Sequence, residues 1–467
     1  MTTLLEALQT EDTTTLNGMV TNSTSKDANV DLFFHIGGMR GQDPISLFVK
    51  AFVEDPLTAL KVTFWCRDVR GGAGERQLFR DVVTYLALQA PEVLKKNIHL
   101  FPEYGRWDDV LTLVGTPLEE DVLDLIGHGL THGDGLLAKW LPRKGPIANK
   151  IRKYLGVSPK VYRKTLVGLS KTVEQSMCAK KFEDIDYEKV PSLAMSRYIQ
   201  SFYRNDESRF SEFKNRLAEG TAKVNAGALY PYDITKAIEY GSDSDNTVQQ
   251  SQWDSLPNYM EGSEKRVLPL VDVSASMDCP VGGNPNLTCM NVAISLGLYI
   301  SERNDGIFKD AFITFSEYPT LEYLKGTLAQ RLHSLASASW GYNTNLEKVF
   351  ELVLNQAVKH DVSPDEMPTD ILILSDMQFD QATDSEQTAY KMIREKFNDA
   401  GYELPNIIFW NLNSYGDVPV AFDEDGTALI SGFSPSILKS VLAGDEMTPL
   451  SIMMETIGSS RYDLVTI

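Results

Sequence analysis

Two aspartates and two serines in the C-terminal half have the types and spacing of an oxygen-ligand metal site. The stretch LPLVDVSASMD is an apolar run that ends at Asp272 and continues with Ser274 and Ser276 at alternate positions. A later apolar run, DILILSD, ends at Asp376. Carboxylate and hydroxyl oxygens together suit a hard divalent cation, Mg²⁺ first and Mn²⁺ or Ca²⁺ as alternatives.

Strand-length apolar runs alternate with helical stretches in this half of the chain. These elements determine where the aspartates and serines lie. The runs are RVLPLVD, DAFITF, DILILSD and NIIFWNL, and the stretches between them are CMNVAISLGLYISER, NLEKVFELVLNQAVKH and QTAYKMIREKFNDAG. This alternation predicts a doubly wound parallel sheet covered on both faces. Ligands bind at the carboxyl ends of such strands, where Asp272 and Asp376 both lie. Thr344, in the loop WGYNTNLEKVF, offers a third hydroxyl just before a helix.

The pattern DxSxS after a strand, a downstream threonine in a loop and an aspartate after a later strand resembles the metal-ion-dependent adhesion site of von Willebrand factor A (vWA) domains. The resemblance covers roughly residues 262–467. It implies that the two serines bind the metal directly, that the threonine does so in one of two states, and that the two aspartates act through water. It also implies an open coordination position that receives a carboxylate from a partner protein.

Two other interpretations of the serines remain open. A serine nucleophile requires a GxSxG turn and a histidine partner, whereas the serines lack the glycines and His333 and His360 lie in helix-like contexts. A turn without a metal, as in a degenerate adhesion site, is the second. The site contains no general base and no second metal, so hydrolysis has little support and we expect a protein that is not an enzyme.

The composition indicates a globular protein of more than one domain. The chain has 467 residues, 43% of them hydrophobic, and it contains four cysteines. No apolar segment is long enough to span a bilayer, and the N-terminus does not have the pattern of a signal peptide. Cys279 and Cys289 flank a loop rich in glycine and proline beside the predicted metal edge, and we expect them to be reduced. We therefore expect a cytoplasmic monomer without membrane contact.

Helical patterns dominate up to about residue 260. DPISLFVKAFVED and DPLTALKVTFWCRD each begin with aspartate and proline, and SPKVYRKTLVGLSKTV begins with serine and proline, which are signals for a helix start. A polar, turn-rich stretch at 241–266 is a plausible linker. The predicted fold class is α + α/β, with a helical, HEAT-like repeat domain at 1–260 and a vWA-like domain at 262–467.

The charge is distributed unevenly along the chain. The net charge is −20, yet residues 139–181 contain twelve Lys or Arg and one acidic residue, a sum of +11. From residue 262 to the end, thirteen Lys or Arg face twenty-nine Asp or Glu, a sum of −16. A basic segment in an acidic chain indicates a partner that carries phosphates, although pairing with the acidic C-terminal half is a serious alternative.

The basic segment, defined as residues 139–181, interleaves its cations with Trp140, Tyr154 and Tyr162. Cations neutralise phosphates and aromatic rings can stack on unpaired bases, so the segment predicts RNA binding. The candidate RNA-binding residues are Lys139, Arg143, Lys144, Lys150, Arg152, Lys153, Lys160, Arg163, Lys164, Lys171, Lys180 and Lys181.

Helical repeats followed by a vWA domain resemble the Ro autoantigen (TROVE) proteins, which bind small noncoding RNAs. The helical half contains RDVRGGAGERQLF, YGRWDDVLTL and FEDIDYEKVPSLAMSRY, which look like fragments of that family. The resemblance implies a ribonucleoprotein in which the repeats are curved or ring-shaped and small noncoding or single-stranded RNA is bound. The alternative is a metal-dependent protein–protein assembly module with no role for RNA.

Three short motifs in the helical half have structural interpretations. RGGAGER, at 70–76, lacks the ending of a phosphate loop and predicts a tight turn between helices. In GRWDD, Arg106 and Asp108 are expected to form an ion pair around a packed Trp107. HGLTH, at 128–132, places two imidazoles four residues apart but lacks the glutamate of a zinc protease, so a helix end is expected there.

Overall fold

The structure is a computed structural model that describes residues 13–241, 243, 245–315, 319–336, 346–379, 389–443 and 446–467. The chain divides into two compact units. The first unit contains the residues up to Val62 together with Tyr230–Lys236 and Pro257–Ser459, and the second contains Thr63–Leu229, Ala237–Leu256 and Ser460–Ile467. No helix among the described residues is both long and apolar enough to cross a membrane.

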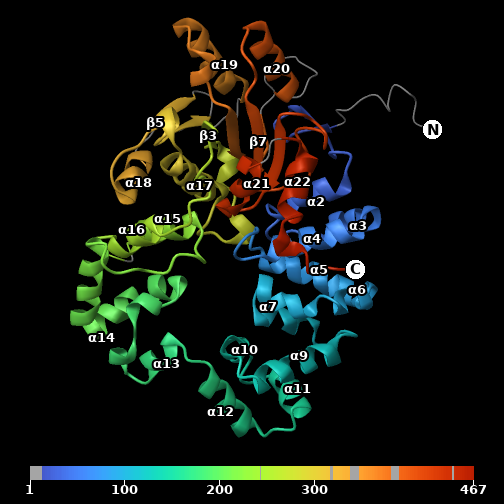
Figure 1. The fold of residues 1–467 in the computed structure, drawn as a ribbon, viewed down its shortest axis with the longest axis vertical. Coiled ribbons are helices and arrows are strands. Elements are labelled where there is room, and N and C mark those ends of the chain that lie inside the picture. The colour runs from blue at the N-terminus through green and yellow to red at the C-terminus, as the bar shows by residue number, and fades with distance from the viewer. Residues whose placement is uncertain are drawn as a thin grey trace. The chain divides into compact units, whose positions relative to one another are not determined.

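A six-stranded sheet forms the centre of the first unit (Figure 1). Its strand order is β5-β4-β3-β6-β7-β8. Every neighbouring pair is parallel except β4 and β5, which are antiparallel. The strands are β3 (Val267–Asp272), β4 (Ala311–Phe315), β5 (Thr320–Tyr323), β6 (Asp370–Ser375), β7 (Asn406–Asn411) and β8 (Thr427–Ser431). The chain continues from β3 to one side and later returns to its other side as β6, so the strand order reverses between β3 and β6, where such sheets bind ligands.

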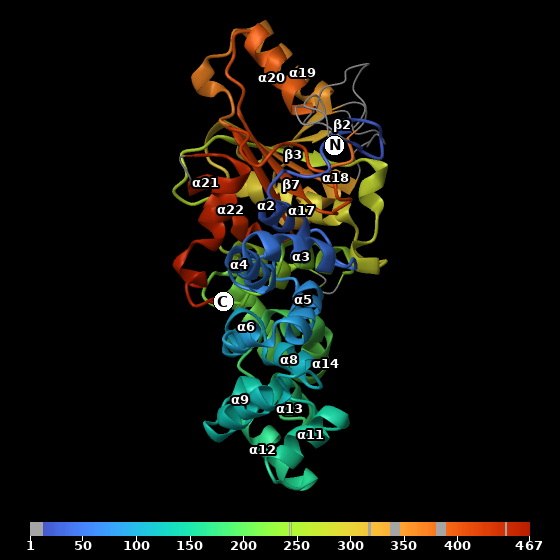
Figure 2. The ribbon, with the colours of Figure 1, turned by 90° about the vertical axis from the view of Figure 1, so that its right-hand side faces the viewer.

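Both faces of this sheet are covered. All six residues of β3 and all six of β6 are buried, and successive side chains of a strand point to opposite faces. Helix α17 (Cys289–Arg303) packs against β3, β4 and β6, whereas α2 (Ala28–Ile36) and α22 (Pro449–Ile457) pack against β8. Figure 2 shows α2 and α22 close to the sheet. The predicted fold class, α + α/β with a helical part and a doubly wound parallel sheet, is confirmed, and the antiparallel pair of β4 and β5 departs from it at one edge of the sheet.

The other elements of the first unit are short strands and helices. They are β1 (Thr13–Thr14), β2 (Val20–Thr21), α3 (Ile45–Glu54), α18 (Leu328–Ala336), α19 (Leu346–His360), α20 (Ala389–Asp399) and α21 (Leu438–Ala443). Helix α4 (Pro56–Arg67) and helix α15 (Pro231–Glu239) each extend from one unit into the other. Strands β5 and β8 were not expected from the sequence.

The two units do not coincide with the predicted division near residue 260. Helix α2 belongs to the first unit because it packs closely on β8: a Cβ at Gly37 would lie 2.5 Å from Ser431 Oγ, and that hydroxyl accepts a hydrogen bond from Gly37 N at 3.0 Å. The last eight residues belong to the second unit. There, Arg461 Nη2 lies 2.7 Å from Asp68 Oδ1, and the Tyr462 hydroxyl donates to Asp68 Oδ2 at 3.0 Å. These long-range contacts cannot be read from local patterns.

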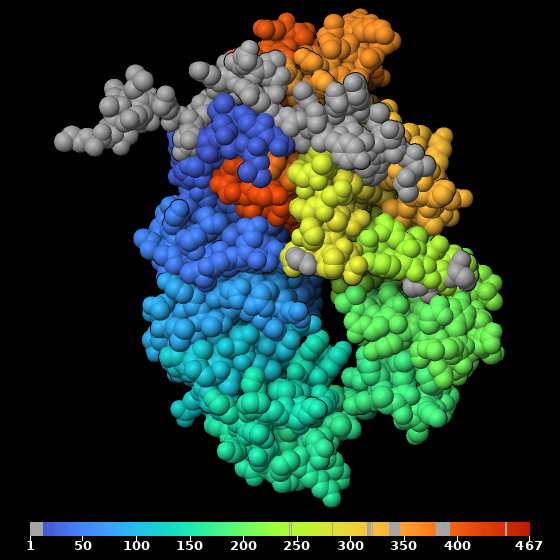
Figure 3. All heavy atoms as spheres, turned by 180° about the vertical axis from the view of Figure 1, so that it is seen from behind, coloured from blue at the N-terminus to red at the C-terminus, as the bar shows by residue number. Residues whose placement is uncertain are grey.

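The second unit consists of helices that follow one another along a curved path (Figure 1). Besides the end of α4, they are α5 (Arg76–Gln89), α6 (Pro91–Lys95), α7 (Phe101–Tyr104), α8 (Trp107–Val110), α9 (Glu119–Thr131), α10 (Gly135–Trp140), α11 (Pro146–Tyr154), α12 (Pro159–Leu169), α13 (Val173–Cys178), α14 (Ser192–Ala218) and α16 (Thr247–Asp254). Figure 3 shows an opening within this unit between the light-blue residues of α5 to α7 and the green residues of α14.

Two of the three predicted helix starts, those of α4 and α12, are confirmed. Helix α3 differs, because Pro44 occupies its cap position without a side-chain cap bond, and Asp43 Oδ1 accepts from Ile45 N at 3.0 Å. Asp55 Oδ1 accepts hydrogen bonds from the backbone nitrogens of Leu57 and Thr58 at the start of α4, at 3.1 and 3.2 Å. Ser158 Oγ accepts from Val161 N at the start of α12, at 3.3 Å. In each case a proline follows the capping residue, where a missing N–H leaves no helical bond unmade.

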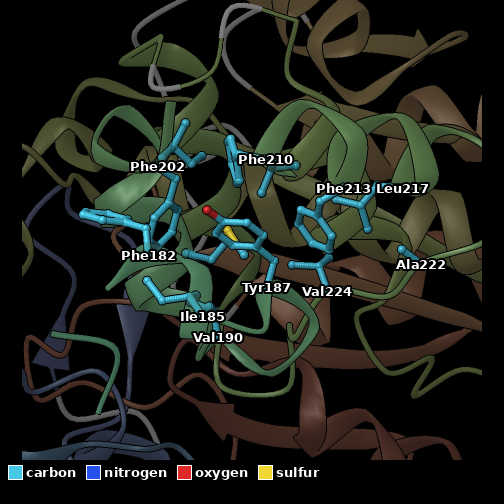
Figure 4. Close-up of a cluster of buried hydrophobic side chains, with 13 residues drawn as sticks. Phe182, Ile185, Tyr187, Val190, Phe202, Phe210, Phe213, Leu217, Ala222 and Val224 are labelled. Atoms are coloured by element: carbon cyan, nitrogen blue, oxygen red, sulfur yellow. The ribbon is translucent and has the colours of Figure 1, made fainter. Parts of the chain in front are cut away.

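An aromatic cluster forms one core of the second unit (Figure 4). The rings of Tyr187, Phe202 and Phe210 pack together, and the centroids of both phenylalanine rings lie 5.1 Å from that of Tyr187 in edge-to-face geometry. Its hydroxyl donates to Asp206 Oδ2 at 2.7 Å. Phe213 lies 5.5 Å from the same ring. This cluster holds the long helix α14 against the segment before it, which begins where the basic segment ends.

Candidate metal site and nucleic-acid interface

The candidate metal edge starts with the turn that leaves β3. Asp272 closes the strand and is fully buried. Its Oδ1 accepts a hydrogen bond from Ser274 N at 2.9 Å, which turns the chain back towards the strand end. The Ser274 and Ser276 hydroxyl oxygens are 3.0 Å apart, so alternate spacing does bring them together. Ser274 is buried and Ser276 is half-buried, at the start of a short 3₁₀ helix, Ala275–Asp278.

The second carboxylate comes from the neighbouring strand. Residues Val271 of β3 and Leu374 of β6 are paired, so Asp272 and the end of β6 lie at the same edge of the sheet. Ser375 Oγ donates to Asp272 Oδ2 at 2.5 Å. Asp376 follows directly and is fully buried. The structure therefore brings together four of the five predicted metal residues, whereas Thr344 lies outside the described residues.

The surroundings of Asp376 destabilise the charged form of its carboxyl group. Its Oδ1 accepts from Gln378 N at 3.2 Å, but its Oδ2 is buried without a hydrogen-bond partner among the described groups. Burial, followed by the negative charge of Asp272, raises the pKa of Asp376 to about 8. A divalent cation bound beside the unpartnered Asp376 oxygen would offset this cost.

The residues present fit a hard cation. The donor set consists of carboxylate and hydroxyl oxygens, which suits Mg²⁺ rather than a metal that prefers sulfur or imidazole. Among the described residues there is no cluster of three or more His, Cys, Asp or Glu side chains that could hold a metal. A site with only two carboxylates depends on hydroxyls and water for its other ligands, which matches the predicted set.

Two supporting residues were missed by the sequence prediction. Ser375 hydrogen-bonds both Asp272 and, at 3.0 Å, Met377 N. Met377 has a positive φ of 65°, which is unusual for a bulky side chain and frequent at functional sites. Gln378 is buried, and its Nε2 donates to Asp417 Oδ1 at 2.9 Å. Their position beside Asp376 in the sequence was the only signal available.

The basic segment lies on the surface of the second unit. Ten of its twelve cations are exposed, and the other two, Lys139 and Arg152, are half-buried. Lys160, Arg163 and Lys164, which are three and four residues apart on helix α12, are all exposed. Among the described residues of this unit, only Lys150 has a carboxylate partner, Glu119 Oε2 at 2.6 Å. The segment therefore forms a surface of cations that are largely without acidic partners in their own unit.

The aromatic residues of the segment differ from the prediction. Tyr162 is buried, and its hydroxyl donates to Pro142 O at 3.1 Å, so its ring supports α12 rather than a base. The Trp140 ring is half-buried, and the Arg106 guanidinium lies over it at 4.1 Å. Tyr154 is 44% exposed, although its hydroxyl donates to Asp124. Tyr154 is thus the aromatic residue of the three most open to a base.

The GRWDD motif is a buried charge network. Arg106 Nε lies 3.1 Å from Asp108 Oδ1, as predicted. Asp109 is fully buried and accepts from Arg67 Nε and Arg80 Nε, each at 2.7 Å. The Trp107 indole donates to Asp134 at 3.1 Å. The network serves packing between α4, α5 and α8.

The other two motifs also have structural roles. In RGGAGER, a Cβ at Gly72 would lie 2.0 Å from Trp65 O, so glycine is required for the turn between α4 and α5. In HGLTH, His132 Nδ1 lies 2.8 Å from His128 O at the end of α9. No third ligand accompanies the two imidazoles among the described residues.

Family models cover most of the chain. The model described as "Domain of unknown function (DUF2828)" matches residues 15–128 and 144–265, about half of the chain. The chain belongs to the DUF2828 family. A second model, "Domain of unknown function (DUF7788)", matches residues 266–459 of this DUF2828 chain. The first family match ends at residue 265 and the second begins at residue 266, close to the domain boundary near residue 260 that the sequence predicts.

Two similar proteins extend these matches. An uncharacterized protein of Acanthamoeba polyphaga mimivirus is 30% identical over 504 aligned positions, which cover 95% of this DUF2828 chain and 86% of the viral protein. The crystal structure of the Deinococcus radiodurans Ro (Rsr) protein matches with a TM-score of 0.52 and 15% identity, covering 92% of this chain and 99% of the other. At this identity the likeness shows the fold, and the fold is Ro-like.

Proposed function

We propose that this chain is a non-enzymatic, Ro-like RNA-binding protein whose RNA is small and noncoding or single-stranded. One observation carries the proposal. In a chain with a net charge of −20, eleven of the twelve cations of the basic segment have no carboxylate partner among the described residues of their unit. Cations on one surface without carboxylate partners attract phosphates. Because they are clustered, the local potential there is positive although the net charge of the chain is negative.

The Ro-like fold supports the proposal at the level of architecture. A helical unit and a sheet unit occur in one chain, and the fold of the chain is Ro-like. We propose that the helical unit contacts the RNA backbone through α11 and α12, where Lys150, Lys153, Lys160 and Lys164 are exposed. Tyr154 is proposed to stack on an unpaired base.

We propose a separate role for the metal edge. A bound divalent cation would supply a positive charge between the two strand ends, with room for a carboxylate from a protein partner. Ser274 and Ser276 would hold it directly, with Thr344, while Asp272 and Asp376 would contribute negative charge. The support is the buried Asp376 oxygen that lacks a partner among the described groups.

Co-purification at low salt tests RNA binding. The expected result is protein with an absorbance shoulder at 260 nm that ribonuclease removes and deoxyribonuclease does not, with short RNA recovered by extraction. Ribonuclease-insensitive absorbance, or none, would contradict the proposal. Degradation of the bound RNA that is lost on Asp272→Ala would contradict its non-enzymatic part.

The second candidate function is a metal-dependent assembly module without RNA. The same Asp376 oxygen favours this second function, because a cation would stabilise the oxygen whether or not the helical unit binds RNA. This candidate predicts a spectrum without nucleic acid together with a protein partner whose capture requires Mg²⁺ or Mn²⁺ and fails with Ser274→Ala. The two candidate functions therefore predict different results from the same purified sample.

A further inference from the structure

Two free cysteines face each other beside the metal edge. The Sγ atoms of Cys279 and Cys289 are 3.3 Å apart, and neither is in a disulfide. Cys279 is half-exposed, whereas Cys289 is buried. Asn413 Nδ2 donates to Cys279 Sγ at 3.4 Å. Of the other two cysteines of the chain, Cys66 is buried and Cys178 is exposed.

The backbone already holds these two cysteines opposite each other. Cys289 N donates to Cys279 O at 3.2 Å, and Val281 N donates to Leu287 O at 2.8 Å. Pro280 and Thr288 form an antiparallel bridge between these bonds. A disulfide has an S–S distance of about 2.05 Å, so the sulfur atoms need to approach by roughly 1.3 Å, which side-chain rotation can supply.

We propose that Cys279 and Cys289 are a redox modification site, which forms a reversible intrachain disulfide that fastens the serine-bearing turn to helix α17. Cys279 directly follows the 3₁₀ helix Ala275–Asp278, which contains Ser276. Cys289 is the first residue of α17, which packs against β3, β4 and β6. The cross-link would therefore join the most exposed part of the metal edge to a helix that is fixed on the sheet, whether or not a cation binds there.

The oxidant is a small disulfide such as glutathione disulfide. The half-exposed Cys279 thiolate attacks one sulfur of the oxidant, which forms a mixed disulfide and releases the first small thiol. The Cys289 thiolate then attacks Cys279 Sγ, which closes the protein disulfide and releases the second small thiol. Two protein thiols are thus oxidised, one small disulfide is reduced to two thiols, and the two protons of the protein thiols pass to the released thiolates.

Titration with glutathione redox buffers, followed by alkylation and mass spectrometry of the native protein, tests the site. We expect oxidation to remove two alkylatable thiols and to yield a peptide that contains Cys279 linked to Cys289. Cys289→Ser should instead accumulate glutathione on Cys279, because the resolving thiol is missing. Cys178→Ser is the matched control and should leave the intrachain disulfide unchanged.

Hydrogen exchange gives a second readout. The amides of residues 274–289 should exchange more slowly in the oxidised protein than in the reduced protein, and Cys279→Ser should remove that difference. The proposal is overturned if both thiols remain alkylatable in fully oxidising buffer, or if Cys289→Ser accumulates no glutathione on Cys279.

Discussion

Asp376 has one carboxylate oxygen that is buried and without a hydrogen-bond partner among the described residues. We predict that Mg²⁺ or Mn²⁺ raises the thermal stability of the protein, since a ligand at a hundredfold excess over its Kd adds about 2.7 kcal/mol to the free energy of unfolding. Asp376→Asn should abolish this increase because the amide carries no charge to bind the cation. Differential scanning calorimetry with and without chelator measures both effects.

The control for this prediction is Asp365→Asn, which changes an exposed aspartate of the same unit. It should keep the full cation-dependent stabilisation. An unchanged melting temperature of the original protein across cation concentrations would refute a cation site at this edge.

His35 provides a test of stability against pH. Its side chain is buried in α2, with Nδ1 2.6 Å from Ser414 Oγ, and burial lowers the pKa of His35 to about 4. The unfolded chain therefore takes up a proton near pH 6.5 while the folded chain does not, so stability falls as the pH is lowered from about 6.5 towards 4. Between pH 7 and pH 5 this group should remove about 2 kcal/mol from the free energy of unfolding.

Urea unfolding of the original protein and of His35→Gln at pH 7 and pH 5 isolates this contribution. The variant should lose about 2 kcal/mol less than the original protein over the same interval, because glutamine does not titrate. Equal losses in the two proteins would show that His35 does not contribute to the acid sensitivity.

Residue types and spacing were sufficient to predict that Asp272, Ser274, Ser276 and Asp376 lie at one edge of the sheet. The β3 register brings Asp272 beside the end of β6, and the alternate spacing brings the two serine hydroxyls to 3.0 Å. Exposure of individual rings was not predictable. Tyr162 was expected to face a base, but its ring is 2% exposed because α12 packs onto α10. Such packing depends on residues far from the ring in sequence.

At the scale of elements, one buried lysine contributes ion pairs to the join between α14 and α16, beside the apolar packing of Val248 on α14. Lys214 Nζ lies 2.6 Å from Asp243 Oδ1, from Asp245 Oδ1 and from the Tyr203 hydroxyl. Lys214→Met should lower the free energy of unfolding by about 3–5 kcal/mol, because Asp243 is then left as a buried charge without its partner. Chemical denaturation of the purified variant measures the loss.

A double variant separates charge from packing at this join. Lys214→Met combined with Asp243→Asn should recover part of the loss, because no buried charge is then left unpaired and Asp245 is exposed to water. Lys223→Met, at an exposed position of the same unit, should change stability by less than about 0.5 kcal/mol. A single Lys214→Met variant as stable as the Lys223 control would show that the join does not depend on the ion pair.

Strong local signals predicted elements well, and weak ones did not. The Asp-Pro and Ser-Pro starts of α4 and α12 were correct because the capping side chain and the proline act within one turn. Strands β5 and β8 were missed because four or five residues give too little periodicity. The assignment of α2 to the sheet unit was missed because it depends on contacts with β8, almost four hundred residues away.

At the scale of the whole molecule, the charge distribution and the fold both support RNA binding by the helical unit. The chain has a Ro-like fold and a strongly acidic composition, and it concentrates +11 in the basic segment of its helical unit. The architecture was predictable because helical and alternating strand–helix patterns occupy long separate stretches. The boundary of the compact units was not, since the N-terminal helices and the last eight residues each join the unit formed mainly by the other part of the chain.

RNA binding through the basic segment is the central claim, and its salt dependence tests the claim most directly. The variant Lys160→Ala, Arg163→Ala, Lys164→Ala removes three exposed cations of α12. The matched control removes three exposed cations elsewhere in the same unit, with Lys189→Ala, Arg204→Ala, Lys223→Ala. Filter binding of the RNA recovered from the purified protein is measured across salt concentrations for all three proteins.

We predict that the α12 variant binds more weakly and that its slope of log affinity against log salt is smaller in magnitude by about 2, as expected when three phosphate contacts to single-stranded RNA are lost. The control variant should keep the slope of the original protein. Equal affinity and equal slope for the original protein and the α12 variant would contradict the account.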